Sequence, residues 1–236
     1  MRLGNFMKKI HHSLLYGYKA NETSYIDFLR EKGVSIGTHT HFYSPWTIKV
    51  DIQRPWMIQI GNHVHIAADC SILQHGYDWA VFQHLYGDVL GSCGTVKIGT
   101  NVFIGQRTLI LKGADIGDNV IIGAGSLVCG PLPSNGVYAG TPARLLMSLN
   151  DYYEKRKKRQ FVEARMLVIS YREKYGENPP KEHLREFFWL FEPRESTIDP
   201  VFKKVHRLDG NEALSQGKFE ETQPMFDGYE SFLKNC

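Results

Sequence analysis

His75 has the surroundings best suited to chemistry in this 236-residue sequence. Tyr77, Asp78 and Trp79 follow it, so an imidazole, a carboxylate and two aromatic rings lie within five positions. A histidine side chain exchanges protons near neutral pH, which suits a general base. A structural histidine bonded to the backbone fits these residues equally well. His84, nine positions on, is a second candidate base.

The cysteines offer weaker chemistry. Cys70, Cys93, Cys129 and Cys236 lie far apart and form no CxxC pair, so they do not suggest a disulfide framework. Cys93 is a weak candidate for a nucleophile, and we expect it to be a bystander.

Composition and charge exclude other classes of protein. Hydrophobic residues make up 42% of the chain, charged residues 22%, and the formal net charge is +3, which is typical of a soluble globular protein. A charge this small argues against nucleic-acid binding, and the run KRKKR at 155–159 fits a solvated helix face better than a polyanion patch. The basic segment 1–19 lacks the features of a signal peptide. A basic amphipathic start could touch a membrane surface, but we expect a helix packed on the body and a cytoplasmic protein.

A six-residue period indicates the elements that position these residues. Aliphatic residues recur at every sixth position, four of six are followed by glycine, and small or β-branched residues occupy the position four places on. Neither a helix nor an alternating strand has this period. The aliphatic positions are Ile98, Ile104, Ile110, Ile116, Ile122 and Val128, with an earlier block in another phase at Ile36, Phe42, Ile48, Ile60, Ile66 and Ile72.

This period is typical of a stacked parallel β-helix with three short strands in each coil. Coils stack about 4.8 Å apart, aliphatic side chains fill the axis, small residues fit the corners, and glycine permits the turns. A β-sandwich would instead show irregular turn signals between its strands. We predict a mainly β fold with a β-helix over residues 34–144.

The period fails between Ile72 and Ile98, so the chain must leave the coil and rejoin it. Excursions this long are usually functional or disordered, and the loop 76–95 is too apolar for disorder. We expect the loop to pack against another surface, such as a neighbouring subunit. His75 should then face outward at the root of this loop.

An N-terminal helical segment is predicted over residues 1–33. Asn21 and Thr23 are candidate caps, and Gly33 ends the predicted helix.

A C-terminal helical extension is predicted over residues 145–236. It contains one long helix ending at Gly176 and a second helix at 181–191. Such an extension can cover the strand edges that the last coil exposes.

The repeats, the loop after a histidine and the closing NGVYAGTPARLL resemble the left-handed β-helix acyltransferases, hexapeptide-repeat enzymes that move acetyl groups from acetyl-CoA to hydroxyls. Similarity is closer to the branch associated with bacterial capsular and exopolysaccharide synthesis, through EKGVSIG, QRPWMIQIGN, HGYDW, YGDVLGSCGTVKIG, DNVIIGAGSLV, YYEKRKK, EFFWLFE and PMFDGYESFL. The resemblance covers nearly the whole chain. It implies a left-handed β-helix, acetyl-CoA as donor, no metal, and a homotrimer with active sites between chains.

The resemblance also implies a role for His75 as the general base that takes a proton from a sugar hydroxyl. Transfer is then direct, without an acyl-enzyme. The family's usual His-Asp-Tyr-Ser-Trp reads His75-Gly76-Tyr77-Asp78-Trp79 here. The carboxylate is absent from its usual place, and Asp78 is a candidate to replace it in orienting His75 or holding the acceptor.

CoA in this fold lies along a groove between coils, and Arg144 suits contact with phosphate. Arg107 and Lys112 are candidates either for CoA phosphates or for the trimer contact. The glycines are also explained as turn residues. The positions matching the family's CoA contacts are Gly105, Gly123, Ala124, Thr141 and Arg144.

Three other functions remain open. An acetyltransferase for a small, antibiotic-like hydroxyl acceptor shares the fold and the loop histidine. A non-catalytic trimeric scaffold is compatible with the glycine at position 76. A zinc carbonic anhydrase also shares the fold, but the histidine pairs His39/His41 and His63/His65 are too closely spaced for its metal site.

The acceptor itself is not specified by the sequence. Polar and aromatic residues of the early coils and loop are candidate sugar contacts, although packing explains them as well: His39, His41, Tyr43, Trp46, Tyr77 and Trp79.

Overall fold

The computed structural model describes residues 14–194, 198–206, 208 and 210–236. The chain forms two compact units, divided between Tyr152 and Tyr153, and each is described by itself. Residues 1–13 of the predicted N-terminal helical segment therefore lie outside the described residues.

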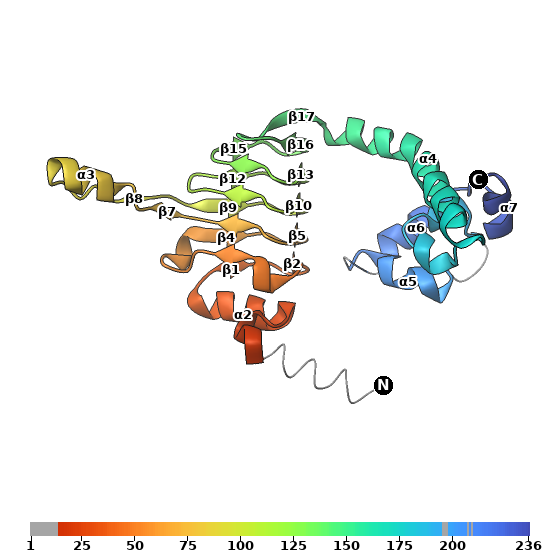
Figure 1. The fold of residues 1–236 in the computed structure, drawn as a ribbon, viewed down its shortest axis with the longest axis horizontal. Coiled ribbons are helices and arrows are strands. Elements are labelled where there is room, and N and C mark those ends of the chain that lie inside the picture. Colours follow the sequence, from red (N-terminus) through yellow and green to blue (C-terminus); the bar gives the residue numbers. More distant parts are fainter. Residues whose placement is uncertain (1–13, 195–197, 207, 209) are drawn as a thin grey trace. The chain divides into compact units, whose positions relative to one another are not determined.

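The first unit is a β-helix built from three parallel sheets (Figure 1). One sheet contains β1 (Ser35–Ile36), β4 (Ile58–Ile60), β9 (Val96–Ile98), β12 (Asp115–Ile116) and β15 (Pro131–Leu132). The second contains β2 (His41–Phe42), β5 (Val64–Ile66), β10 (Val102–Ile104), β13 (Val120–Ile122) and β16 (Gly136–Ala139). The third contains β3 (Lys49–Val50), β6 (Ser71–Ile72), β11 (Leu109–Ile110) and β14 (Leu127–Val128).

The predicted aliphatic positions form the core of this unit. All twelve are buried, none being more than 9% exposed. The small residues two places before them, such as Thr108 and Ser126, are buried too, and each hydroxyl donates to a preceding glycine carbonyl at 2.7 and 2.6 Å. The prediction of a coiled parallel fold with an aliphatic axis is confirmed.

The early coils are longer than the six-residue period suggests. Lys97 pairs with Asp115, one coil of 18 residues later, but Lys49 pairs with Ser71 and Ser35 with Gln59. The extra residues form the turns η2 (Pro45–Thr47) and η3 (Pro55–Met57). Ile48 is buried, but Val50 is the residue that pairs with Ile72.

Position 105 needs a glycine because the backbone of the next coil lies too close for a side chain, not because the chain turns there. A Cβ atom on Gly105 would lie 2.5 Å from the backbone nitrogen of Ala124. The left-handed turn positions are instead occupied by residues such as Asn101, Arg107 and Asn119, with φ of 58°, 62° and 56°. The expectation that this glycine serves turn geometry is therefore wrong.

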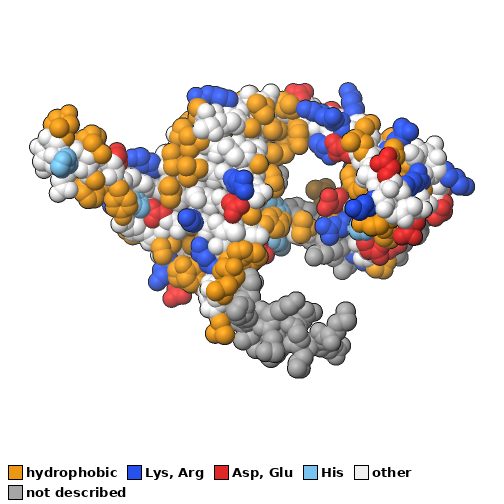
Figure 2. Space-filling model, in the orientation of Figure 1, with side chains coloured by type: hydrophobic (Ala, Val, Ile, Leu, Met, Phe, Trp, Pro, Cys, Tyr) orange, Lys and Arg blue, Asp and Glu red, His pale blue; other side chains and the backbone are white. Residues whose placement is uncertain are grey.

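The predicted loop forms a projecting hairpin, here called the arm (residues 75–93; Figure 1). The strands β7 (His75–Gly76) and β8 (Ser92–Cys93) pair antiparallel at its base, and α3 (Trp79–Tyr86) forms its tip. Exposed hydrophobic side chains cover α3 (Figure 2). The break in the period therefore reflects a folded element.

The helix α2 (Glu22–Lys32) follows the turn η1 (Gly17–Lys19) and covers the first coil. The Asn21 side chain accepts from the backbone N–H of Ser24 at 2.9 Å, and Gly33 ends the helix with φ of 105°. Asn21 is thus the cap, whereas Thr23 lies inside the helix. At the other end, β17 (Arg144–Ser148) pairs antiparallel with β16.

The second unit is helical and has its own core. It contains most of α4 (Leu149–Tyr175), then η4 (Lys181–Leu184), η5 (Phe188–Leu190), α5 (Pro200–His206), α6 (Glu212–Glu221) and α7 (Gly228–Lys234). Its core is largely aromatic, with Phe188, Phe191, Phe202, Phe219 and Phe232 all buried.

The long helix predicted to end at Gly176 is confirmed by α4. The helix predicted at 181–191 is wrong: two short 3-10 turns take its place. Phe188 and Leu190 are both buried, yet two positions apart they would lie on nearly opposite sides of an α-helix. Among the described residues, no helix is long and apolar enough to cross a membrane.

Candidate active site

His75 is held by a carboxylate from an earlier coil. Its Nδ1 lies against Oδ2 of Asp51, which directly follows β3. Only 14% of the His75 side chain and 9% of the Asp51 side chain are exposed. Little water therefore screens the pair, and its electrostatic interaction is stronger than it would be at the surface.

The coil itself fixes the position of Asp51. Its backbone N–H donates to Ile72 O at 2.9 Å, and its Oδ1 accepts from the backbone N–H of Gln53 at 3.0 Å. A carboxylate at Nδ1 favours the proton on that nitrogen, which leaves Nε2 as an acceptor. The arrangement can therefore take a proton from a hydroxyl presented to Nε2.

Tyr77 forms an aromatic wall beside the imidazole. The Tyr77 ring meets His75 edge-on with centroids 4.9 Å apart, and Trp79 lies 6.1 Å beyond. The Tyr77 hydroxyl accepts from the Gln53 amide at 3.3 Å. Both predicted loop aromatics thus lie next to or near the candidate base.

In the part of the chain described, no hydrogen bond or ion pair joins Asp78 to His75. Its Oδ1 lies over the backbone of Gly76, 2.7 Å from where a Cβ would be. Lys112 Nζ lies 4.0 Å from the same point, so this lysine belongs to the base of the arm. The structure therefore brings Asp51, not Asp78, to the imidazole.

His84 and Cys93 differ in their relation to His75. His84 is exposed on α3, away from the base of the arm. Cys93 is the cross-strand partner of His75, so its side chain lies on the same face of the hairpin. The buried thiol of Cys70 donates to Gly105 O at 3.2 Å, and burial raises its pKa.

The predicted CoA positions form a column of closely stacked backbone in the later coils. Gly105 lies against Ala124, and a Cβ on Gly123 would lie 2.9 Å from Cβ of Ala139. The assignment of CoA contacts to this column stays a prediction.

Thr141 and Arg144 lie where the chain turns from β16 to β17. Thr141 donates to Gly125 O at 3.4 Å, and exposed Arg144 donates to Ala143 O at 3.0 Å. Arg107 is also exposed, with its nearest carboxylate at Asp69, 3.9 Å away. These cations can reach a phosphate, and their roles stay predictions.

The early-coil histidines stack in two pairs. The rings of His39 and His63 are 5.0 Å apart, as are those of His41 and His65. His41 also pairs with Glu22 at 3.0 Å. Within the described ranges, no three histidine, cysteine or acidic side chains gather as metal ligands.

Three contributors to the site escaped the sequence analysis: Asp51, Gln53 and the location of Lys112 at the arm. The apparent period through Ile48 concealed the two residues that η2 inserts, and thereby the register of β3. A pairing of Val50 with Ile72 would have indicated Asp51 beside the root of the loop.

Known proteins are similar mainly to the β-helical part of the chain. The family described as bacterial transferase hexapeptide (six repeats) matches residues 95–130. Galactoside O-acetyltransferase of Escherichia coli (strain K12) is 33% identical over 127 residues, which span 52% of this chain and 61% of that protein. Less than two thirds of that relative is thus covered.

Two further relatives are similar. Protein CapG of Staphylococcus aureus is 33% identical over 129 residues, 55% of this chain and 74% of CapG. Escherichia coli (strain K12) WbbJ, named for O-acetyl transfer in lipopolysaccharide biosynthesis, is 42% identical over 104 residues, 39% of this chain and 51% of WbbJ.

Proposed function

This chain is an acyltransferase of the bacterial hexapeptide-repeat family, and we propose that it is an acetyl-CoA-dependent O-acetyltransferase acting on a sugar hydroxyl in a surface polysaccharide or its precursor. The names of the galactoside enzyme and WbbJ support O-acetyl transfer to a carbohydrate. We also propose that the coil is left-handed and that the protein is cytoplasmic.

The observation that carries the proposal is the Asp51–His75 pair at the root of the aromatic arm. His75 Nε2 accepts the hydroxyl proton while the sugar oxygen attacks the carbonyl carbon of the thioester. The carbon–sulfur bond breaks, and the CoA sulfur leaves with the proton returned by His75. The products are the sugar ester and free CoA, so no acyl-enzyme and no metal enter the balance.

The donor is proposed to lie along the Gly105–Ala124 column, with Arg144 near its phosphates. A homotrimer supplies the second wall of that groove. The exposed hydrophobic side chains of α3 support such an assembly, because patches of this kind often mark protein contacts.

The test is release of the CoA thiol from acetyl-CoA with a panel of sugars and saccharides. We expect His75→Ala to lower turnover by about 10²–10⁴-fold with CoA binding intact, and His84→Ala to have little effect. Cys93→Ser should keep its activity because transfer is direct. Equal activity in the native protein and in His75→Ala would remove His75 from the mechanism. A native chain that does not bind CoA would instead favour the non-catalytic scaffold.

A further inference from the structure

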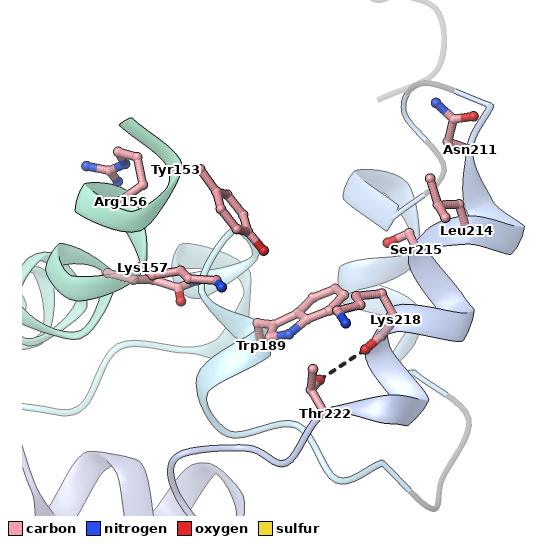
Figure 3. Close-up of a pocket in the computed structure, with 10 residues that line it drawn as sticks. Tyr153, Arg156, Lys157, Trp189, Asn211, Leu214, Ser215, Lys218 and Thr222 are labelled. Carbon is pink, nitrogen blue, oxygen red and sulfur yellow. Dashed lines mark hydrogen bonds between the residues drawn. The ribbon is translucent and has the colours of Figure 1, made fainter. Parts of the chain in front are cut away.

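The helical unit contains a pocket of about 510 Å³ that the proposed reaction does not use (Figure 3). Its walls come from three elements of that unit: Tyr153 and Gln160 of α4, Trp189 of η5, and residues of α6. The volume lies within the roughly 300–1,000 Å³ typical of small-molecule sites.

Trp189 forms a fixed aromatic surface in this pocket. Its ring is wedged against Phe219, edge to face at 5.1 Å, and Arg194 donates to its carbonyl at 2.8 Å. Arg194 also lies over the Phe219 ring at 4.0 Å. The indole is only partly buried and lines the pocket. It therefore offers a ligand an apolar face and one donor.

Neutral polar groups surround this aromatic surface. Gln160 and Asn211 each supply an amide, which both donates and accepts, and Ser215 and Thr222 supply hydroxyls. Tyr153 faces the pocket from α4 and is 52% exposed (Figure 3). An aromatic face with amides and hydroxyls around it matches a ligand that has an apolar face and a rim of hydroxyls.

Each charged side chain of the pocket has a carboxylate partner. Arg156 forms two hydrogen bonds with Glu163, at 2.7 and 2.6 Å. Lys157 pairs with Glu154 at 3.3 Å, and Lys218 with Glu221 at 3.2 Å. Each of the three cations in the lining is therefore paired with a carboxylate that lies outside the lining.

We propose that this pocket binds one sugar residue of a neutral glycan, with the C–H face of the ring on Trp189 and the hydroxyls on the surrounding amides and hydroxyls. The proposal rests on the proposed function only in naming that glycan as the acceptor. Binding by the helical unit raises the local concentration of acceptor for the same chain. A polymer should therefore be a better acceptor than its monosaccharide.

The test uses the full chain labelled with 5-fluorotryptophan. The chain has four tryptophans, and each gives a separate ¹⁹F signal. Trp189→Phe assigns the signal of Trp189. The probes are lactose, maltotriose and chitotriose, with inorganic phosphate and decanoate representing an anion and an acyl chain. We expect the Trp189 signal to shift in a saturable way with at least one of the three saccharides and with neither control.

Ser215→Phe should block the pocket without touching the aromatic core, because Ser215 lies on the pocket side of α6. Ala213→Phe, on the same helix but outside the lining, is the matched control. We expect the first change to abolish the saccharide shift and to raise KM for a polymeric acceptor at least about tenfold, with KM for the monosaccharide unchanged. The second change should alter neither.

The binding result and the catalytic result separate the two proposals. A shift that persists in His75→Ala, together with no acetyl transfer by the native chain, would leave the pocket assigned and the proposed function wrong. Normal transfer without any shift of the Trp189 signal would overturn the glycan pocket. A shift with decanoate or phosphate alone would also overturn it, in favour of a lipid chain or an anion.

Discussion

A buried carboxylate beside the imidazole does two things for a general base. It fixes the orientation of the ring, and it stabilises the positive charge that appears when Nε2 takes a proton. Asp51 can do both because the backbone N–H of Gln53 and the coil hold it in place. It acts through His75, so it is a positioning residue.

Asp51→Asn should lower kcat by roughly 10²-fold, the lower end of what general base catalysis contributes. The amide keeps the size of the side chain but loses the charge that favours the imidazolium. KM for acetyl-CoA should stay unchanged, because Asp51 lies outside the Gly105–Ala124 column that we propose for the donor. Steady-state kinetics of thiol release would measure both.

Asp78→Asn is the matched control, since Asp78 lies over Gly76 and, among the described residues, no hydrogen bond or ion pair joins it to His75. A large loss of kcat in Asp78→Asn, with none in Asp51→Asn, would reverse the assignment.

His75 and the presence of an arm after it could be predicted from the sequence, because a broken period is visible in one dimension. Asp51 could not, because the contact between residues 51 and 75 depends on the register of stacked coils. That register depends on the residues that the turns η2 and η3 add to the early coils, which separate Lys49 from Ser71 and Ser35 from Gln59 by more than 18 positions. Short insertions of this kind leave the hydrophobic pattern nearly intact.

At the scale of the elements, neighbouring coils are only one strand spacing apart. Side chains at the corners therefore have little room beside the backbone of the next coil. Gly105 is the clearest example, and Thr108 closes the same corner by donating to its carbonyl. The period correctly predicted the buried axis. It explained this glycine by turn geometry, whereas the close backbone of the next coil is the reason for it.

Gly105→Ala should destabilise the β-helix by about 1–3 kcal/mol, because the added methyl group meets the backbone of Ala124. Gly130→Ala is the matched control: a Cβ there meets nothing within 4 Å, so its effect should stay within about 0.5 kcal/mol. Urea unfolding of both variants measures the difference. Equal stabilities would contradict the close-stacking explanation.

For the whole molecule, the exposed apolar tip of the arm predicts self-association. Sedimentation equilibrium should give three times the 27.0 kDa mass of the chain. Leu85→Lys replaces a leucine that is 66% exposed and should shift the mass toward the monomer. Gln83→Lys adds the same charge to α3 without removing apolar surface, so its mass should stay trimeric. A native mass of one chain would contradict this prediction.

The helical unit should lose stability in acid. Lys181 donates to Asp199 at 2.9 Å, and this contact holds the pKa of the carboxyl below its ordinary 3.8. The stabilisation is therefore complete above about pH 3.8 and disappears as pH falls through the lowered pKa of the folded state. Asp199→Asn should melt at a lower temperature at pH 7, with the difference vanishing near pH 2.

Far-UV circular dichroism measures this transition, because the helical unit holds most of the described helix. Asp227→Asn, at an exposed aspartate, should melt like the native chain at both pH values. A difference between Asp199→Asn and the native chain that stays constant down to pH 2 would exclude the ion pair as its cause.

The arm is closed at its own base. His75 pairs with Cys93, and the backbone N–H of Gly94 donates to Gln74 O at 2.9 Å, so the coil below keeps its register whatever lies beyond that pair. Each doubling of a loop's length costs only about 0.6 kcal/mol in closure entropy. Residues 77–91 can therefore change in length and sequence without moving the Asp51–His75 pair below them.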